Sequence, residues 1–144
     1  MTTSPSSTEP TRAPDLEALA LVRVAAQAAS EKLAEETVAL EVGELLSVVE
    51  YFIVTSGRNA RQVASIVEII EEATKRELGR GPIRIEGLRE PSWVLMDYGD
   101  VVIHVFVNET RDFYDLEHLW SGAPRADLGD VEVHPRTPVP IVAD

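Results

Sequence analysis

Two carboxylates lie at the turn of an otherwise apolar hairpin. Residues 93–107 read WVLMDYGDVVIHVFV, so Asp97 and Asp100 separate two apolar runs, and Trp93 and His104 flank them. Paired carboxylates can bind Mg²⁺, or one can act as general acid and the other as general base. With a nearby tryptophan they can instead form the rim and the apolar anchor of a surface for a basic protein. Aspartate is also an ordinary turn residue, so three interpretations compete.

The loop of this hairpin decides where the two carboxylates point. We expect a two-residue loop formed by Tyr98 and Gly99, because Gly99 can take the positive φ that most such turns need. This loop places Asp97 opposite Asp100, and like charges directly opposite each other destabilise a sheet slightly. A cationic partner would compensate. Because side chains alternate, the predicted core face carries Val94, Met96, Val101, Ile103 and Val105, and the other face carries Trp93, Leu95, Asp97, Asp100, Val102 and His104.

The catalytic interpretation needs further groups near the hairpin. Only Glu86 and His104 are close in the sequence, and the chain contains no GxxxxGK, HExxH or GxSxG motif. The enzyme alternative is therefore a nucleotidyltransferase-like, Mg²⁺-dependent site made by Asp97, Asp100 and Glu86. Such an enzyme should show a Gly-Ser turn followed by an Asp-x-Asp pair, whereas residues 55–58 read TSGR. The glycine of this segment precedes a predicted helix, whose first amides could hold an anion.

Composition and charge narrow the choice of partner. The 144 residues are 44% hydrophobic and 26% charged, which is typical of one globular domain, and the absence of cysteine excludes disulfides and thiolate chemistry. A net charge of −12 opposes binding to DNA or RNA and suits either a basic protein partner or solubility alone. No apolar run approaches the roughly 20 residues of a membrane span, and no secretory signal is evident. We therefore expect a cytoplasmic protein.

The chain divides into a core and two tails. Residues 1–14 are rich in Ser, Thr and Pro, and residues 121–144 contain four prolines, so we expect both segments to be disordered. The core, residues 15–120, shows helical and alternating apolar patterns in the order αββαβββα. This order predicts an α/β or α+β fold with a mixed sheet of about five strands flanked by helices. The predicted helices cover residues 16–36, 57–79 and 111–120, and the predicted strands cover residues 37–42, 51–56, 82–87 and the two arms of the hairpin.

A long series of distinctive residues has fixed spacing between residues 85 and 120, which read IEGLREPSWVLMDYGDVVIHVFVNETRDFYDLEHLW. The series is Glu86-Gly87, Trp93, Asp97, Gly99-Asp100, His104, Tyr114, Leu116-Glu117 and Leu119-Trp120. This pattern resembles that of the ribosomal silencing factor family, also called the RsfS or Iojap-like family. Residues 40–66 are similar to the first half of the family, so the resemblance covers the whole predicted core.

The resemblance implies a fold, a role and a binding site. The implied fold is α/β with a mixed five-stranded sheet flanked by helices, and it is related to nucleotidyltransferases but lacks their catalytic motif. The implied protein is therefore not an enzyme and needs no cofactor or metal. The implied role is to bind the large ribosomal subunit at ribosomal protein L-fourteen, to block joining of the small subunit, and to repress translation when nutrients are short. Family members are often homodimers when free. The partner-binding residues expected from the resemblance and the hairpin are Glu86, Trp93, Asp97, Tyr98, Asp100 and His104.

Overall fold

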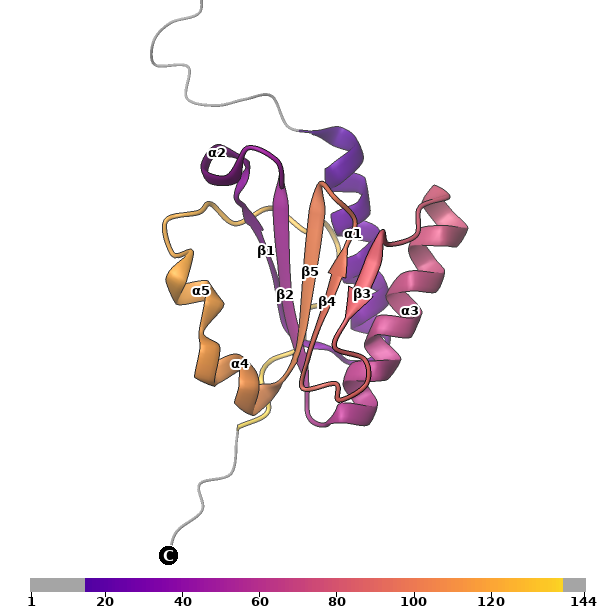
Figure 1. Ribbon diagram of the computed structural model, residues 1–144, viewed down its shortest axis with the longest axis vertical. Coiled ribbons are helices and arrows are strands. Elements are labelled where there is room, and N and C mark those ends of the chain that lie inside the picture. The colour runs from indigo at the N-terminus through magenta and orange to yellow at the C-terminus, as the bar shows by residue number, and fades with distance from the viewer. Residues whose placement is uncertain (1–14, 139–144) are drawn as a thin grey trace, which may run out of the picture.

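Five strands form one mixed sheet in the computed structural model, which describes residues 15–138 (Figure 1). The strand order is β1-β2-β5-β4-β3; β2 and β5 are parallel and the other neighbouring pairs are antiparallel. This arrangement confirms the predicted α/β fold with a mixed five-stranded sheet. The elements are α1 (Leu16–Glu31), β1 (Glu35–Glu41), α2 (Gly43–Leu46), β2 (Tyr51–Gly57), α3 (Ala60–Leu78), β3 (Arg84–Glu86), β4 (Trp93–Asp97), β5 (Val101–Val107), α4 (Asn108–Tyr114) and α5 (Leu116–Leu119).

Two long helices, α1 and α3, cover one face of the sheet (Figure 1). The carboxylate of Asp15 accepts the N–H of Ala18 at 3.0 Å and so caps the start of α1, and Gly79 ends α3 with a φ of 66°. Their apolar stripes pack on the sheet, and each fully buried large aliphatic side chain contributes roughly 1.5–3 kcal/mol. The buried side chains include Leu21, Val22, Val63, Ile66 and Ile70 from the helices, and Ile53, Met96, Ile103 and Val105 from the strands.

No helix within residues 15–138 is both long enough and apolar enough to cross a membrane.

The hairpin loop between β4 and β5 begins one residue later than predicted. The N–H of Tyr98 donates to the carbonyl of Val101 at 2.9 Å, so the loop consists of Gly99 and Asp100. Gly99 has a φ of 91° and is the first residue of the loop, whereas the prediction made it the second. Each residue of β4 therefore pairs two positions further along β5 than predicted, and Asp97 does not lie opposite Asp100. Because side chains alternate with a period of two, this shift leaves both strands on their predicted faces.

The helix predicted over residues 111–120 is two short helices, and α4 begins earlier, at Asn108. The break falls at Asp115, whose φ of 52° is left-handed and cannot continue a right-handed helix. The carbonyl of Asp115 accepts the N–H of Leu119 at 3.2 Å, so the same residue ends α4 and starts α5. We call α4 and α5 the α4–α5 arm. It presents Phe113 and Leu119, which are 80% and 70% exposed.

Residues 121–138, which we call the C-terminal strap, lie along the core. The prediction of a disordered tail over residues 121–144 is wrong for these residues, while residues 139–144 and the predicted tail of residues 1–14 lie outside the described part of the chain. Proline is incompatible with a helix or a central strand, but it permits an extended segment beside a sheet edge. Three backbone hydrogen bonds join the strap to the outer edge of β1: Glu41 to Pro124, Ala126 to Ala39, and Glu36 to His134.

Truncation of the chain after residue 120 tests whether this segment is a disordered tail or a strap that stabilises the fold. Loss of the strap should lower the free energy of unfolding by about 3 kcal/mol or more, at roughly 1 kcal/mol for each backbone hydrogen bond to β1. Urea unfolding of the truncated chain, beside a control chain that ends at residue 138, measures the difference. Equal unfolding midpoints for the two chains would show that the strap contributes nothing and would restore the prediction of a disordered tail.

Candidate functional site

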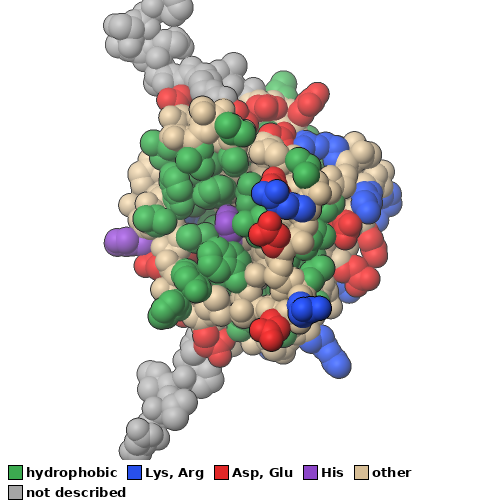
Figure 2. All heavy atoms as spheres, in the orientation of Figure 1, with side chains coloured by type: hydrophobic (Ala, Val, Ile, Leu, Met, Phe, Trp, Pro, Cys, Tyr) green, Lys and Arg blue, Asp and Glu red, His purple; other side chains and the backbone are tan. Residues whose placement is uncertain are grey.

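The second face of the sheet is only partly covered. The α4–α5 arm and α2 shield its β1 side, where Leu116 and Trp120 pack on buried strand residues. Figure 2 shows hydrophobic side chains gathered in one broad patch on the side that carries the arm, with charged side chains mostly around it. Exposed apolar patches of this kind mark interaction sites on soluble domains. This patch is therefore the candidate functional site.

Aromatic rings run in contact across this face. The centroids of successive rings lie between 4.7 and 6.0 Å apart, within the range of favourable aromatic pairs. His104 lies buried in the middle, whereas the two residues from the arm are exposed, Phe113 by 80% and Tyr114 by 49%. We call these six residues the aromatic row, in spatial order: Phe113, Tyr114, Trp93, His104, Phe52 and Trp120.

Two hollows flank Trp93, which forms the ridge between them. One hollow, of about 450 Å³, is lined by Ser92, Trp93, Glu109, Thr110, Phe113 and Tyr114. The other, of about 360 Å³, is lined by Glu86, Gly87, Trp93 and Leu95. Each hollow thus combines apolar walls with one carboxylate. This combination suits long cationic side chains, whose aliphatic stems pack on apolar surface while the charged end meets a carboxylate.

The three predicted carboxylates are each paired with an arginine of the chain itself. Asp100 accepts two hydrogen bonds from Arg80, at 2.7 and 3.2 Å, which fixes the hairpin loop to the segment after α3. Asp97 and Glu86 share Arg84, at 3.2 and 3.0 Å. Within residues 15–138, no three carboxylate or imidazole groups lie close enough together to hold a metal ion. The geometry therefore gives no support to the Mg²⁺-dependent alternative.

The predicted anion site at the start of α3 is filled by the chain itself. The side-chain oxygen of Gln62 accepts the N–H of Arg58 at 2.7 Å, and the N–H of Gln62 donates to the side chain of Asn59 at 2.8 Å. Gly57 leaves room for this side chain, because a Cβ at residue 57 would lie 3.0 Å from Oε1 of Gln62. These amides already have acceptors, so a phosphate group would have to displace Gln62.

Two of the predicted partner-binding residues, Tyr98 and His104, have buried side chains. Tyr98 is 3% exposed; its hydroxyl lies 2.8 Å from that of Thr74, and burial raises its pKa. The loop shift explains this, because it turns Tyr98 toward the core. His104 is 6% exposed and accepts the indole N–H of Trp93 on Nδ1 at 3.2 Å. Burial lowers the pKa of His104 to about 4.

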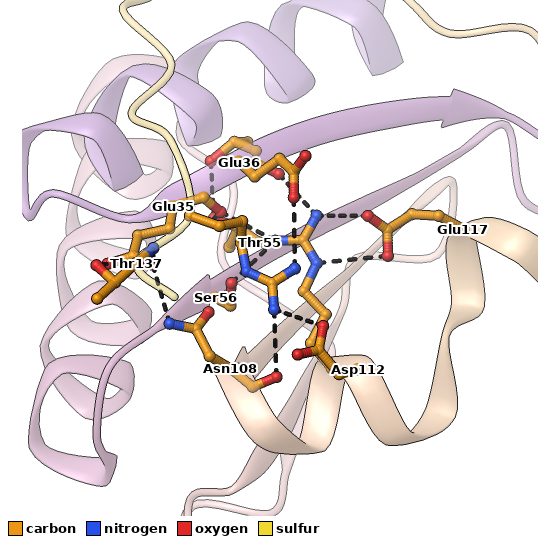
Figure 3. Close-up of polar contacts among 11 residues, drawn as sticks. Glu35, Glu36, Thr55, Ser56, Asn108, Asp112, Glu117 and Thr137 are labelled. Carbon is orange, nitrogen blue, oxygen red and sulfur yellow. Dashed lines mark hydrogen bonds and ion pairs between the residues drawn. The ribbon is translucent and has the colours of Figure 1, made fainter. Parts of the chain in front are cut away.

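The α4–α5 arm is fixed by Arg111, a residue that no sequence motif singles out. Its guanidinium is 1% exposed and donates to the carbonyls of Glu35 and Glu36 at 2.9 and 2.7 Å (Figure 3). It also donates to the hydroxyl of Ser56 at 2.9 Å and to the carboxylate of Glu117 at 2.6 Å. One side chain thus joins β1, β2 and both helices of the arm, and so sets where Phe113 and Tyr114 stand.

The end of the strap is fixed beside the same cluster (Figure 3). The carboxylate of Glu35 accepts the backbone N–H and the hydroxyl of Thr137, both at 2.7 Å, and the side-chain amide of Asn108 at 2.9 Å. Burial opposes ionisation of Glu35, but these hydrogen bonds outweigh it and lower its pKa. Arg136 adds a hydrogen bond to Asp112 on α4 at 2.6 Å. The strap therefore supports the arm as well as the edge of β1.

The fold and the site define a small α/β domain whose sheet has one filled face and one face that presents an aromatic row. The chain belongs to the ribosomal silencing factor family: a family model described as "Ribosomal silencing factor during starvation" matches residues 15–140. The matched span includes the strap, so the family domain extends beyond residue 120, where the predicted core ended.

Individual relatives agree with this membership. The chain is 40% identical over 108 residues to ribosomal silencing factor RsfS of Bacillus subtilis, covering 75% of this chain and 91% of that protein. It is 30% identical over 90 residues to "Mitochondrial assembly of ribosomal large subunit protein 1" of Mus musculus, covering 61% of this chain and 40% of that protein. A crystal structure from Chromobacterium violaceum has a TM-score of 0.69 at 26% identity and covers 90% of this chain and 95% of that one. A second, from Bacillus halodurans, has a TM-score of 0.65 at 34% identity and covers 78% and 99%.

Arg111→Met tests the anchoring of the arm. Removing one partner from a buried, hydrogen-bonded ion pair should lower the free energy of unfolding by about 3–5 kcal/mol. Arg76→Met is the matched control, since the Arg76 side chain is 65% exposed, and its effect should stay within about 0.5 kcal/mol. Chemical denaturation of both variants gives the comparison. A loss below about 1 kcal/mol for Arg111→Met would mean that Arg111 does not anchor the arm.

His104 should make the folded state sensitive to mild acid. Its pKa falls from 6.5 to about 4 on folding, so below pH 6.5 the unfolded chain takes up the proton and the folded chain does not. Stability should therefore drop as the pH falls from 6.5 toward 4, by about 3 kcal/mol at 1.36 kcal/mol for each pKa unit. Unfolding free energies across this range, compared with those of His104→Phe, isolate the effect because both chains share the same carboxylates. Parallel curves for the two proteins would refute this role of His104.

Proposed function

We propose that this chain silences translation by binding the large ribosomal subunit at ribosomal protein L-fourteen through the aromatic row. The observation that carries the proposal is the exposure of aromatic rings on the sheet face that α1 and α3 leave open. Exposed aromatic anchors within a contiguous apolar patch are typical of interface hot spots. Membership of the ribosomal silencing factor family supplies the class of partner.

The charge of the chain supports a basic partner. The net charge is −12, and the two hollows beside Trp93 contribute the carboxylates of Glu109 and Glu86. Ribosomal proteins are commonly basic, so such a surface would be steered toward the chain at low salt and less so at high salt. Asp97 and Asp100 remain proposed rim residues, although their pairing with Arg84 and Arg80 makes their first role the bracing of the hairpin.

The proposed block is steric and needs no chemistry. A domain seated on the face of the large subunit where the small subunit docks would exclude the small subunit by occupying its place. This mode of action is non-enzymatic and requires no cofactor, and it places the protein in the cytoplasm with the ribosomes. We also propose that the free chain forms a homodimer through the aromatic row, because burying an apolar patch against a second copy removes it from water.

Binding to isolated large ribosomal subunits tests the proposal, measured by co-sedimentation over a series of salt concentrations. Trp93→Ala and Phe113→Ala should each weaken binding by about 2 kcal/mol, which is roughly 30-fold in Kd. Leu16→Ala is the matched control, because Leu16 is 73% exposed and lies at the start of α1, away from the aromatic row. Its affinity should equal that of the unsubstituted chain.

Three results would contradict parts of this proposal. Equal affinity of Trp93→Ala and the unsubstituted chain would remove the aromatic row as the binding surface. Affinity that does not change with salt would remove the electrostatic contribution. Binding that persists on large subunits depleted of ribosomal protein L-fourteen would move the contact to another component of the subunit.

A further inference from the structure

Trp93 is held by rings on two sides and by one hydrogen bond. Its indole stacks on Phe106 with centroids 4.9 Å apart and contacts Tyr114 at 4.7 Å. Its N–H donates to Nδ1 of His104 at 3.2 Å. Ring packing alone tolerates rotation and sliding, whereas a hydrogen bond is directional. Nδ1 of His104 therefore selects one orientation of the indole, and with it the shape of both hollows.

The surroundings of His104 are apolar apart from this bond. The ring meets Phe52 edge-on at 5.0 Å, and its neighbours across the sheet are Val54 and Leu95. Because Nδ1 accepts from Trp93, the neutral ring carries its proton on Nε2. Nε2 is buried and has no hydrogen-bond partner within the described residues.

A buried donor without an acceptor costs free energy, so His104 is a poor choice for stability alone. A phenylalanine would keep a ring against Phe52 and would remove the unpaired N–H. What phenylalanine lacks is the Nδ1 acceptor for the indole of Trp93. The hydrogen bond that Nδ1 accepts from Trp93 therefore accounts for a histidine at this position.

We propose that His104 is a positioning residue for docking: its Nδ1 holds the indole of Trp93 in the orientation that the partner recognises. The inference rests on the proposed function, since it assumes that Trp93 meets the partner. His104 itself touches no partner and acts through Trp93. If the hydrogen bond is lost, the half-buried indole can turn its N–H toward water, and the ridge between the hollows changes shape.

His104→Phe tests the proposal with isolated large ribosomal subunits as the probe. At pH 7 its unfolding midpoint should equal or exceed that of the unsubstituted chain, while its affinity falls about tenfold. Trp93→Phe keeps a ring but has no indole N–H, so it should also lose about tenfold. In the Trp93→Phe background, His104→Phe should change affinity less than about twofold, because the hydrogen bond is already absent.

A spectroscopic measurement reports the bond directly. The indole N–H resonance of Trp93 is identified by its disappearance in Trp93→Phe. In His104→Phe this resonance should shift toward that of a hydrated indole and exchange faster with water. A resonance that stays in place would overturn the proposal even if His104→Phe proved too unstable for binding studies.

The remaining outcomes separate this proposal from the docking function. Full affinity of His104→Phe, with Trp93→Ala still impaired, would overturn the positioning role and leave docking intact. An equal tenfold loss in both backgrounds would show that His104 acts by packing, independently of the indole N–H. Absence of binding by the unsubstituted chain would overturn the docking function, and the positioning proposal with it.

Discussion

The buried guanidinium of Arg111 is the contact on which the candidate site depends. It donates to two carbonyls of β1, to a β2 hydroxyl and to the carboxylate of Glu117 on α5. One of these carbonyls belongs to Glu36, which has a left-handed φ of 45° at the irregular part of β1. The α4–α5 arm contributes few buried apolar side chains of its own. Its position, and so that of Phe113 and Tyr114, follows from this polar anchor.

The two faces of the sheet differ in how fully they are covered. On one face, α1 and α3 bury the main apolar core, which supplies most of the free energy of folding. On the other face, the arm and α2 leave the aromatic row partly exposed. The hairpin belongs to both faces: Tyr98 and Met96 point into the core, while Trp93 and Leu95 line the open face. The Arg80–Asp100 and Arg84–Asp97 ion pairs connect the same hairpin to the segment after α3 and to β3.

Patterns with a fixed period could be predicted from the sequence, and contacts set by tertiary structure could not. The stripe of Val63, Ile66 and Ile70 identified α3, and alternation placed the side chains of β4 and β5 on their correct faces. The prediction of the hairpin register was wrong because the register depends on which loop position takes the positive φ of Gly99. The alternation of side chains cannot detect a shift of two residues, since both registers place the same residues on each face.

The contacts of the strap and of Arg111 could not be predicted from the sequence for a related reason. The prolines of residues 121–138 exclude regular elements, but nothing local reveals an extended segment that pairs with β1. A lone Arg111 among charged residues looks exposed, and only the fold shows its four acceptors. Within the candidate site, Trp93 was predicted from its place on the hairpin and from the family resemblance, whereas the burial of His104 and the arginine partners of the carboxylates required the structure.

The proposed block of subunit joining requires the chain to occupy the site on the large subunit where the small subunit docks. The most direct measurement is co-sedimentation of the chain with isolated large subunits, isolated small subunits and preformed joined ribosomes at one salt concentration. We expect the chain to bind large subunits alone and to be excluded from small subunits and from joined ribosomes. Equal binding to large subunits and to joined ribosomes would contradict it, because a chain that leaves the docking face free cannot block joining.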